Sequence, residues 1–259
     1  MSTVRLPARS TERCALADGV EGLWPGVAWL PASRALVVAD AHLAYEDVIG
    51  GALPLWSTGE TVAMLTVLRR RTDAREIVFL GDVVHGARMS EGAARGVRAA
   101  LDALRAEAEV TLVAGNHEGR SRAFAVLGAT VERLERDGWL LVHGDGAPQF
   151  TRRTIVGHLH PSLDLGGGAT APAFVASESL VIVPALTPYS PGLDCCSDDV
   201  RAVLGAWNVR PEEAHVAAVG GEFIHPFGAL SQLRALLRGA RRVSTPGRMR
   251  RRKRLGPDY

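Results

Sequence analysis

The chain has 259 residues, 47% hydrophobic and 22% charged, with a formal net charge of +2, a composition that is ordinary for a globular protein and argues against disorder. This length allows one large domain or two small ones. The first twenty residues contain no apolar block of the kind found in signal peptides, and no apolar run approaches the ~18 residues of a membrane span. The three cysteines match neither a disulfide framework nor zinc-site spacing, so we expect a reducing, cytoplasmic setting and no membrane association.

The first half of the chain reads as strands alternating with helices. Residues 1–35 are expected to form an irregular or short-stranded lead-in, and residues 43–56 a loop with Gly and Pro. Ser57 and Glu60 fit a capping box for the helix that follows, and Ser90 fits the N-cap of a second helix. Buried strands are predicted at 36–39, 77–80 and 110–114, and helices at 57–71, 90–106 and 121–127.

The second half reads as strands with few helices. Strands are predicted at 131–134, 139–142, 154–156, 173–176 and 180–183, and a closing helix at 231–240. Strand–helix alternation followed by a strand-rich half favours an α/β fold in which two sheets pack together. No internal repeat or strong linker precedes residue 241, so we expect one domain over residues 1–240 and a C-terminal tail over 241–259.

The tail carries a different charge from the rest of the chain. It holds eight of the 30 basic residues and one of the 28 acidic residues, which leaves +7 on the tail and −5 on the body. One interpretation is a solvated, disordered terminus. The other is a non-specific contact with the phosphates of nucleic acid.

Five polar clusters follow predicted strands or turns and together carry five of the eight histidines. Carboxylate oxygens and imidazole nitrogens suit divalent first-row metals, and alternate residues of an extended segment point to the same side. Glycines in these clusters allow the backbone to turn sharply and approach closely. The clusters are Asp40-x-His42, Gly81-Asp82, Gly115-Asn116-His117-Glu118, His143-Gly144-Asp145 and Gly157-His158-Leu159-His160.

Each cluster alone has an ordinary structural interpretation. Asp40-x-His42 could be a surface or capping feature, Gly81-Asp82 a turn, and the last cluster a solvated turn. An ordinary structural role is harder to find for the Gly115–Glu118 stretch, because three polar groups at a strand end have few structural uses. The five clusters occur in this order, each after an apolar run. This arrangement favours one shared site to which all of them contribute.

This series resembles the motif set of the calcineurin-like metallophosphoesterases, over residues 36–160. Residues 157–161 and 183–194 are also similar to a subgroup of small prokaryotic members, the DNA-ligase-associated phosphoesterases and their archaeal relatives. The resemblance implies a layered sandwich of two packed mixed β-sheets flanked by helices. It also implies two divalent metal ions, of which Mn²⁺ is expected first, with Fe, Zn and Mg as alternatives.

The resemblance assigns the site residue by residue. His117 matches the family's histidine that binds no metal and protonates the leaving oxygen, while a hydroxide bridging the metals attacks phosphorus. No ligand position is missing. The implied ligands are Asp40, His42 and His160 for the first metal, Asp82 as a bridge, and Asn116, His143 and His158 for the second metal.

Further residues near the motifs are weaker candidates. His85 could face the substrate or be a loop histidine, and Arg88 and Arg120 could contact phosphate oxygens or be solvated. Asp145 could orient His143, and Tyr189 could line the pocket. Glu118 is expected to support its neighbours without binding metal.

The sequence therefore predicts a metal-dependent phosphodiesterase for nucleic-acid or nucleotide-type diesters. A phosphomonoesterase acting on nucleotides or phosphoproteins is the alternative, because the motifs alone fit both. A binding scaffold without turnover is a third reading, which the full ligand set disfavours.

Overall fold

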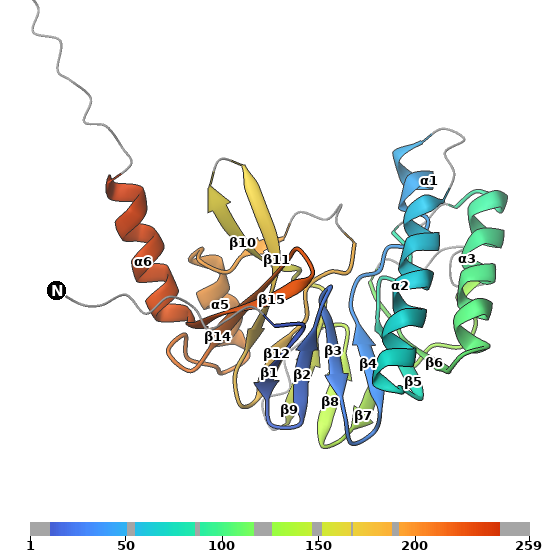
Figure 1. Cartoon of the computed structure of the whole chain (residues 1–259), viewed down its shortest axis with the longest axis horizontal. Helices are drawn as coiled ribbons and strands as arrows, with labels where there is room; N and C mark the ends of the chain where they lie inside the picture. Colours follow the sequence, from blue (N-terminus) through green and yellow to red (C-terminus); the bar gives the residue numbers. More distant parts are fainter. Residues whose placement is uncertain are drawn as a thin grey trace, which may run out of the picture.

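The computed structural model describes residues 11–50, 55–85, 89–116, 126–146, 152–166, 168–187 and 192–243. Two β-sheets lie face to face, with α1, α2 and α3 on one side of the molecule and α5 and α6 on the other (Figure 1). The expected α/β sandwich of two mixed sheets flanked by helices is confirmed.

The first sheet has six strands in chain order. Its first four strands are antiparallel, whereas β4, β5 and β6 run parallel. The lead-in thus supplies three short strands, which agrees with the short-stranded alternative predicted for it. The strands are β1 (Arg13–Ala17), β2 (Val20–Leu23), β3 (Val27–Leu30), β4 (Ala35–Val38), β5 (Glu76–Leu80) and β6 (Glu109–Val113).

The second sheet has nine strands and is also mixed. Strands β8, β9 and β12 are mutually parallel, and β10 and β11 form an antiparallel hairpin. The strands are β7 (Leu134–Arg136), β8 (Trp139–Val142), β9 (Arg153–Val156), β10 (Pro161–Gly166), β11 (Ala169–Ala176), β12 (Leu180–Ile182), β13 (Leu193–Asp194), β14 (His215–Gly220) and β15 (Phe223–Ala229).

Helices cover the outer face of each sheet. On the inner faces of two of these helices, Leu65 and Leu68 of α2 and Val97 of α3 are buried. Ser90 caps α3 as predicted, since its hydroxyl accepts a hydrogen bond from Ala93 N at 3.1 Å. The helices are α1 (Tyr45–Ile49), α2 (Trp56–Thr72), α3 (Glu91–Arg105), α5 (Asp199–Ala206) and α6 (Leu230–Val243).

Three apolar layers hold the sandwich together. Leu36 and Phe79 face α2 and α3, whereas their neighbours Val37 and Val78 face the second sheet. Central parallel strands that are covered on both faces have continuous apolar sequences. This explains why these strands could be predicted from the sequence. The third layer packs the far side of the second sheet against α5 and α6.

The capping box predicted at Ser57 and Glu60 is wrong. The N-cap of α2 is Leu55, which makes no side-chain cap, and Ser57 N donates instead to Glu46 Oε1 at 2.7 Å. Glu46 belongs to α1, a short helix inside the segment that was expected to be a loop. A distant carboxylate therefore replaces the local cap.

The second half contains more structure than its sequence predicted. Val131 makes only an isolated bridge to Val113, and the strand begins three residues later, at Leu134. Helix α5 and strands β10, β13, β14 and β15 were not predicted. The helix expected at 121–127 falls mostly outside the described residues, and the closing helix extends to Val243.

None of the helices in the described part of the chain is both long enough and apolar enough to cross a membrane. Residues 244–259, which include most of the basic tail, lie outside the described residues.

Candidate metal centre

The candidate site lies where the parallel strands of both sheets end. Asp40 and His42 follow β4, Asp82 follows β5 and Asn116 follows β6. In the second sheet, His143 follows β8, and His158 and His160 follow β9. The two sheets meet at this edge, because Leu186 N, beyond β12, donates to Ala39 O at 2.9 Å. Ligands collected from carboxyl ends of parallel strands are typical of α/β folds.

Six of the predicted ligands form two groups with the composition of metal sites. In each group, one possible ligand atom per residue lies within 4.8 Å of the others. The groups consist of Asp40, His42 and His160, hereafter group 1, and of Asp82, His143 and His158, hereafter group 2.

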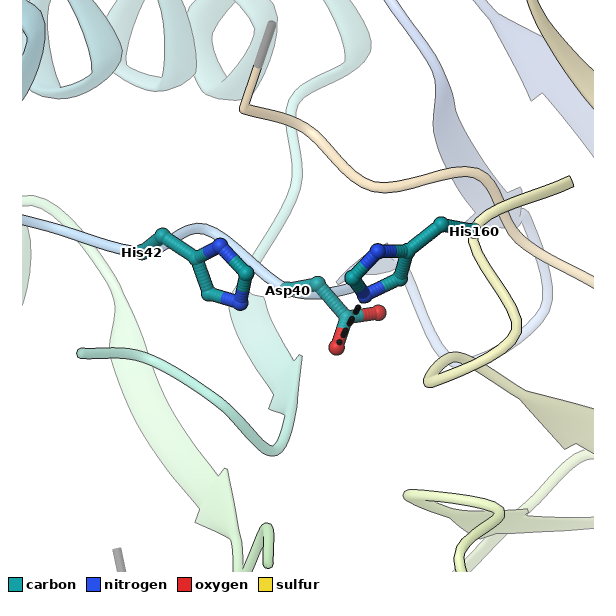
Figure 2. Close-up of side chains that lie close together, drawn as sticks. All are labelled: Asp40, His42 and His160. Atoms are coloured by element: carbon teal, nitrogen blue, oxygen red, sulfur yellow. Dashed lines mark ion pairs between the residues drawn. The ribbon is translucent and has the colours of Figure 1, made fainter. Parts of the chain in front are cut away.

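Group 1 is built around a fully buried carboxylate. Figure 2 shows the imidazoles of His42 and His160 on either side of Asp40. Asp40 Oδ1 lies 3.0 Å from His160 Nε2 and, among the described residues, accepts no hydrogen bond. Desolvating a carboxylate is costly unless a cation or donors compensate for the lost water.

Group 2 is built around His143, which is almost completely buried. Its Nδ1 lies 2.8 Å from Leu80 O, and because a carbonyl only accepts, this contact places the proton on Nδ1. In that tautomer Nε2 is an acceptor, and it lies 2.8 Å from Asn116 Oδ1 and 3.5 Å from Asp82 Oδ2. Three electron-rich atoms thus converge on one point.

His158 completes group 2, with Nδ1 3.1 Å from His143 Nε2. Burial, and then the neighbouring His143, lower the pKa of His158 below its ordinary value. The neutral form that binds metals is therefore favoured at neutral pH.

These donor sets fit divalent cations. A cation at each group would relieve the buried charge of Asp40 and the convergence of acceptors around His143. The structure places Asp82 in group 2, and its expected role as a bridge to group 1 stays a prediction.

The motif glycines are needed because the chain segments approach too closely for a side chain. A Cβ at Gly81 would lie 2.5 Å from His143 Nδ1, and one at Gly157 would lie 2.8 Å from Asp40 Oδ2. A Cβ at Gly115 would overlap Asp82 N and Oδ1. The expectation that these glycines permit close approach is confirmed.

The site backbone is strained. Five of the six residues of groups 1 and 2 have φ between 42° and 58°, namely Asp40, His42, Asp82, His158 and His160. Left-handed conformations cost an ordinary residue of order 1 kcal/mol or more and gather at functional sites. Asp and His tolerate this region better than most residues do.

The structure describes only some of the other residues that the sequence proposed for the site. The His85 ring centroid lies 4.5 Å from that of His42, so His85 borders group 1. The hypothesis that Asp145 orients His143 is wrong, because Leu80 O occupies the Nδ1 side. His117, Glu118, Arg88, Arg120 and Tyr189 lie outside the described residues.

Sequence reasoning missed Tyr45, whose ring centroid is 5.2 Å from that of His85 and 6.4 Å from that of His42. Its position three residues after His42 was the available signal. It also missed Leu80 O, and no sequence pattern marks a backbone carbonyl as an orienting group.

A cavity adjoins each group. One, of about 150 Å³, is lined by His143 of group 2, Asp145 and Trp207. The other, of about 170 Å³, is lined by His160 of group 1 and by residues that include Ser162 and Thr187. One residue of each group therefore lies in the wall of a cavity.

No curated protein matches the sequence, whereas a family model and a solved structure do. In structure the chain is similar to nuclease MPE of Pseudomonas putida, with a TM-score of 0.62 and 25% sequence identity over 85% of this chain and 99% of that chain. Residues 33–171 match the family model of the calcineurin-like phosphoesterases. This match spans more than half of the sequence and contains all the residues of groups 1 and 2, so the chain belongs to the calcineurin-like phosphoesterases.

Proposed function

We propose that the protein is a two-metal phosphodiesterase that hydrolyses nucleic-acid or nucleotide-type diesters. The observation that carries the proposal is the convergence of groups 1 and 2 on one edge of the sandwich, with a cavity beside each. Asp40, His42 and His160 would hold one cation. Asp82, Asn116, His143 and His158 would hold the other, with Asp82 shared between them.

Two bound cations supply Lewis-acid stabilisation of the phosphoryl oxygens and lower the pKa of a bound water. The chain's own residues do the positioning. Leu80 O holds the His143 ring so that Nε2 faces inward, and Asp40 Oδ2 holds the backbone of His158 at 2.8 Å. Preorganised ligands of this kind avoid reorganisation during the reaction.

The proton needed by the leaving oxygen is assigned to His117, which follows Asn116 directly. An imidazole titrates near neutral pH, which suits a general acid. This role rests on the match of His117 to the family motif. Beside group 1, His85 is the candidate for contact with substrate or the attacking water, and Arg88 and Arg120 are candidates for phosphate contacts.

Two observations favour a diester over a monoester. A diester carries two organic substituents on phosphorus. The structure has two cavities that could receive them, one beside group 2 and one beside group 1. The structurally similar protein from Pseudomonas putida is described as a nuclease. A monoester would need only one of the cavities.

The metals are proposed to be Mn²⁺, since the mixed oxygen and nitrogen ligands suit a borderline first-row cation. None of the three cysteines forms a disulfide, which agrees with a cytoplasmic setting. The basic tail is a candidate contact for nucleic-acid phosphates. If so, deleting residues 244–259 should weaken DNA binding at low salt and have little effect at high salt.

The test is hydrolysis with Mn²⁺ of methyl 4-nitrophenyl phosphate, a diester, against 4-nitrophenyl phosphate, a monoester. We expect faster hydrolysis of the diester. A strong preference for the monoester would instead support the phosphomonoesterase alternative. Stoichiometric metal without turnover of either ester would support the scaffold reading.

A further inference from the structure

The cavity beside group 2 has an apolar floor and an aromatic wall. It lies on the helix-facing side of the second sheet, because Val142 packs with Trp207 in the outer apolar layer while Leu141 faces the first sheet. Leu140 and Val142 line it from β8, and Trp207 lines it from the end of α5. The indole is only partly buried, so part of its surface remains available to a ligand.

Two carboxylates, Glu132 and Asp145, also line this cavity and are exposed. An ionised carboxylate accepts hydrogen bonds and donates none. The pair therefore disfavours a phosphate here and favours a group that presents N–H donors. The cavity beside group 1 differs, because its described lining residues include Ser162, Thr170 and Thr187 and no carboxylate.

The size of the cavity limits what it can hold. Its volume is about 150 Å³, and an engineered protein cavity of that volume is known to hold a single benzene ring. A flat six-membered ring fits this volume and can pack on the indole and on Leu140 and Val142, with an amino group toward a carboxylate. Cytosine has this form, whereas thymine presents a carbonyl where cytosine has its amino group.

We infer that this cavity is a nucleobase subsite which holds a pyrimidine next to the scissile phosphate and prefers cytosine to thymine. Trp207 supplies the stacking surface, and Glu132 or Asp145 accepts from the exocyclic amino group. The inference rests on the proposed phosphodiesterase function, since His143 belongs both to the cavity wall and to group 2.

Binding tests the subsite separately from turnover. The probes are d(CpC) and d(TpT) with a methylphosphonate linkage, which resists hydrolysis, titrated calorimetrically into the full chain loaded with Mn²⁺. We expect d(CpC) to bind about tenfold or more tightly, as one directed base contact contributes. Equal affinities would overturn the inference.

Substitutions identify the residues involved. Trp207→Ala should weaken binding of both probes by about tenfold or more, because stacking is tolerant of base identity, and Trp207→Phe should restore most of it. Glu132→Gln should reduce the preference for d(CpC) without weakening d(TpT). Phe223→Ala replaces an exposed aromatic residue at the start of β15 that is not among the described lining residues of either cavity, so it is the matched control and should change nothing.

Kinetics then separates the two proposals. With phosphodiester-linked d(CpC), Trp207→Ala should raise KM, while hydrolysis of methyl 4-nitrophenyl phosphate, which has no base, stays unchanged. An equal loss with both substrates would show a structural role and overturn the inference. Selective binding of d(CpC) without hydrolysis of any diester would support the subsite and contradict the proposed function.

Discussion

Asp40 and His158 lie 118 positions apart in the sequence and are joined by a hydrogen bond of 2.8 Å from His158 N to Asp40 Oδ2. Asp40 follows β4 of the first sheet and His158 follows β9 of the second. The same carboxylate faces His160 through its other oxygen. One side chain therefore connects the two sheets, group 1 and the backbone of group 2.

Asp40→Asn should remove most of the activity. The amide keeps the shape but loses the charge, and the catalytic contribution of a metal amounts to several kcal/mol, which corresponds to a loss of at least about 10²-fold in kcat. Metal analysis of the purified variant should show fewer ions per chain. Asp102→Asn on the exposed side of α3 is the matched control. Full metal content and activity in Asp40→Asn would remove Asp40 from the ligand set.

Metal loading should stabilise the fold. Asp40 and Asp82 are 0% and 2% exposed, and cations would compensate for their burial. At 100 times Kd, one bound ion adds ~2.7 kcal/mol, roughly 5–10 °C in Tm for a chain of this size. Thermal melts with chelator and with Mn²⁺ measure the shift. Unchanged melting would contradict metal binding by these groups.

His117→Ala should separate proton transfer from metal binding. General acid catalysis contributes about 10²–10⁴-fold, so turnover of d(CpC), whose leaving alkoxide needs a proton, should fall by this amount. A 4-nitrophenyl diester has a leaving group that departs as a stable anion, so its hydrolysis should fall much less. Metal content should stay the same. Loss of metal from the variant would show that His117 is a ligand.

The first half of the sandwich could be predicted from the sequence because its central strands are covered on both faces. Runs such as those ending at Val38 and Leu80 are apolar throughout, and the polar residues that follow stand out against them. The polar clusters that contain the residues of groups 1 and 2 could therefore be recognised from their order and type, and the resemblance to the calcineurin-like metallophosphoesterases assigned the individual ligands.

What could not be predicted depends on contacts between distant segments. Glu46 caps α2 and Leu80 O orients His143 across 63 positions, and no local pattern encodes either contact. Strands β14 and β15 lie near the edge of the second sheet, where alternation is interrupted by residues such as Pro226. Their pairing is decided by tertiary packing and not by local propensity.

Gly115→Ala should damage the site without replacing a ligand. The added methyl group would overlap Asp82 N and Oδ1 and lie 3.0 Å from Gly81 Cα, so the Asp82 loop must move. A displacement of about 1 Å at a catalytic group can cost about 10²-fold in rate. Steady-state kinetics with methyl 4-nitrophenyl phosphate measures the loss.

Gly205→Ala on α5 is the control for Gly115→Ala. Its Cβ would meet nothing within 4 Å, and alanine is the better helix former. It should keep full activity and gain up to about 1 kcal/mol of stability. Normal activity in Gly115→Ala would mean that Asp82 can shift without consequence, and would remove it from the catalytic centre.

Glu76 and Arg136 form an ion pair at the end of the sheets opposite the candidate site. Arg136 Nε lies 2.8 Å from Glu76 Oε2, and Thr111 donates to Oε1 at 2.6 Å. The pair joins β5 to β7 and thus one sheet to the other. The Glu76 side chain is 6% exposed and that of Arg136 29%.

Arg136→Met should therefore destabilise the protein while sparing catalysis. It leaves the buried Glu76 carboxylate without its cation, which costs about 3–5 kcal/mol in a fully buried pair and less here, about 2–3 kcal/mol, because Arg136 is partly solvated. Urea unfolding measures the loss, and kcat of the folded protein at low temperature should be unchanged. The double variant Glu76→Leu with Arg136→Met should recover much of the stability, since apolar replacement removes the stranded charge. A double variant less stable than Arg136→Met alone would show that the pair contributes more than the desolvation it costs.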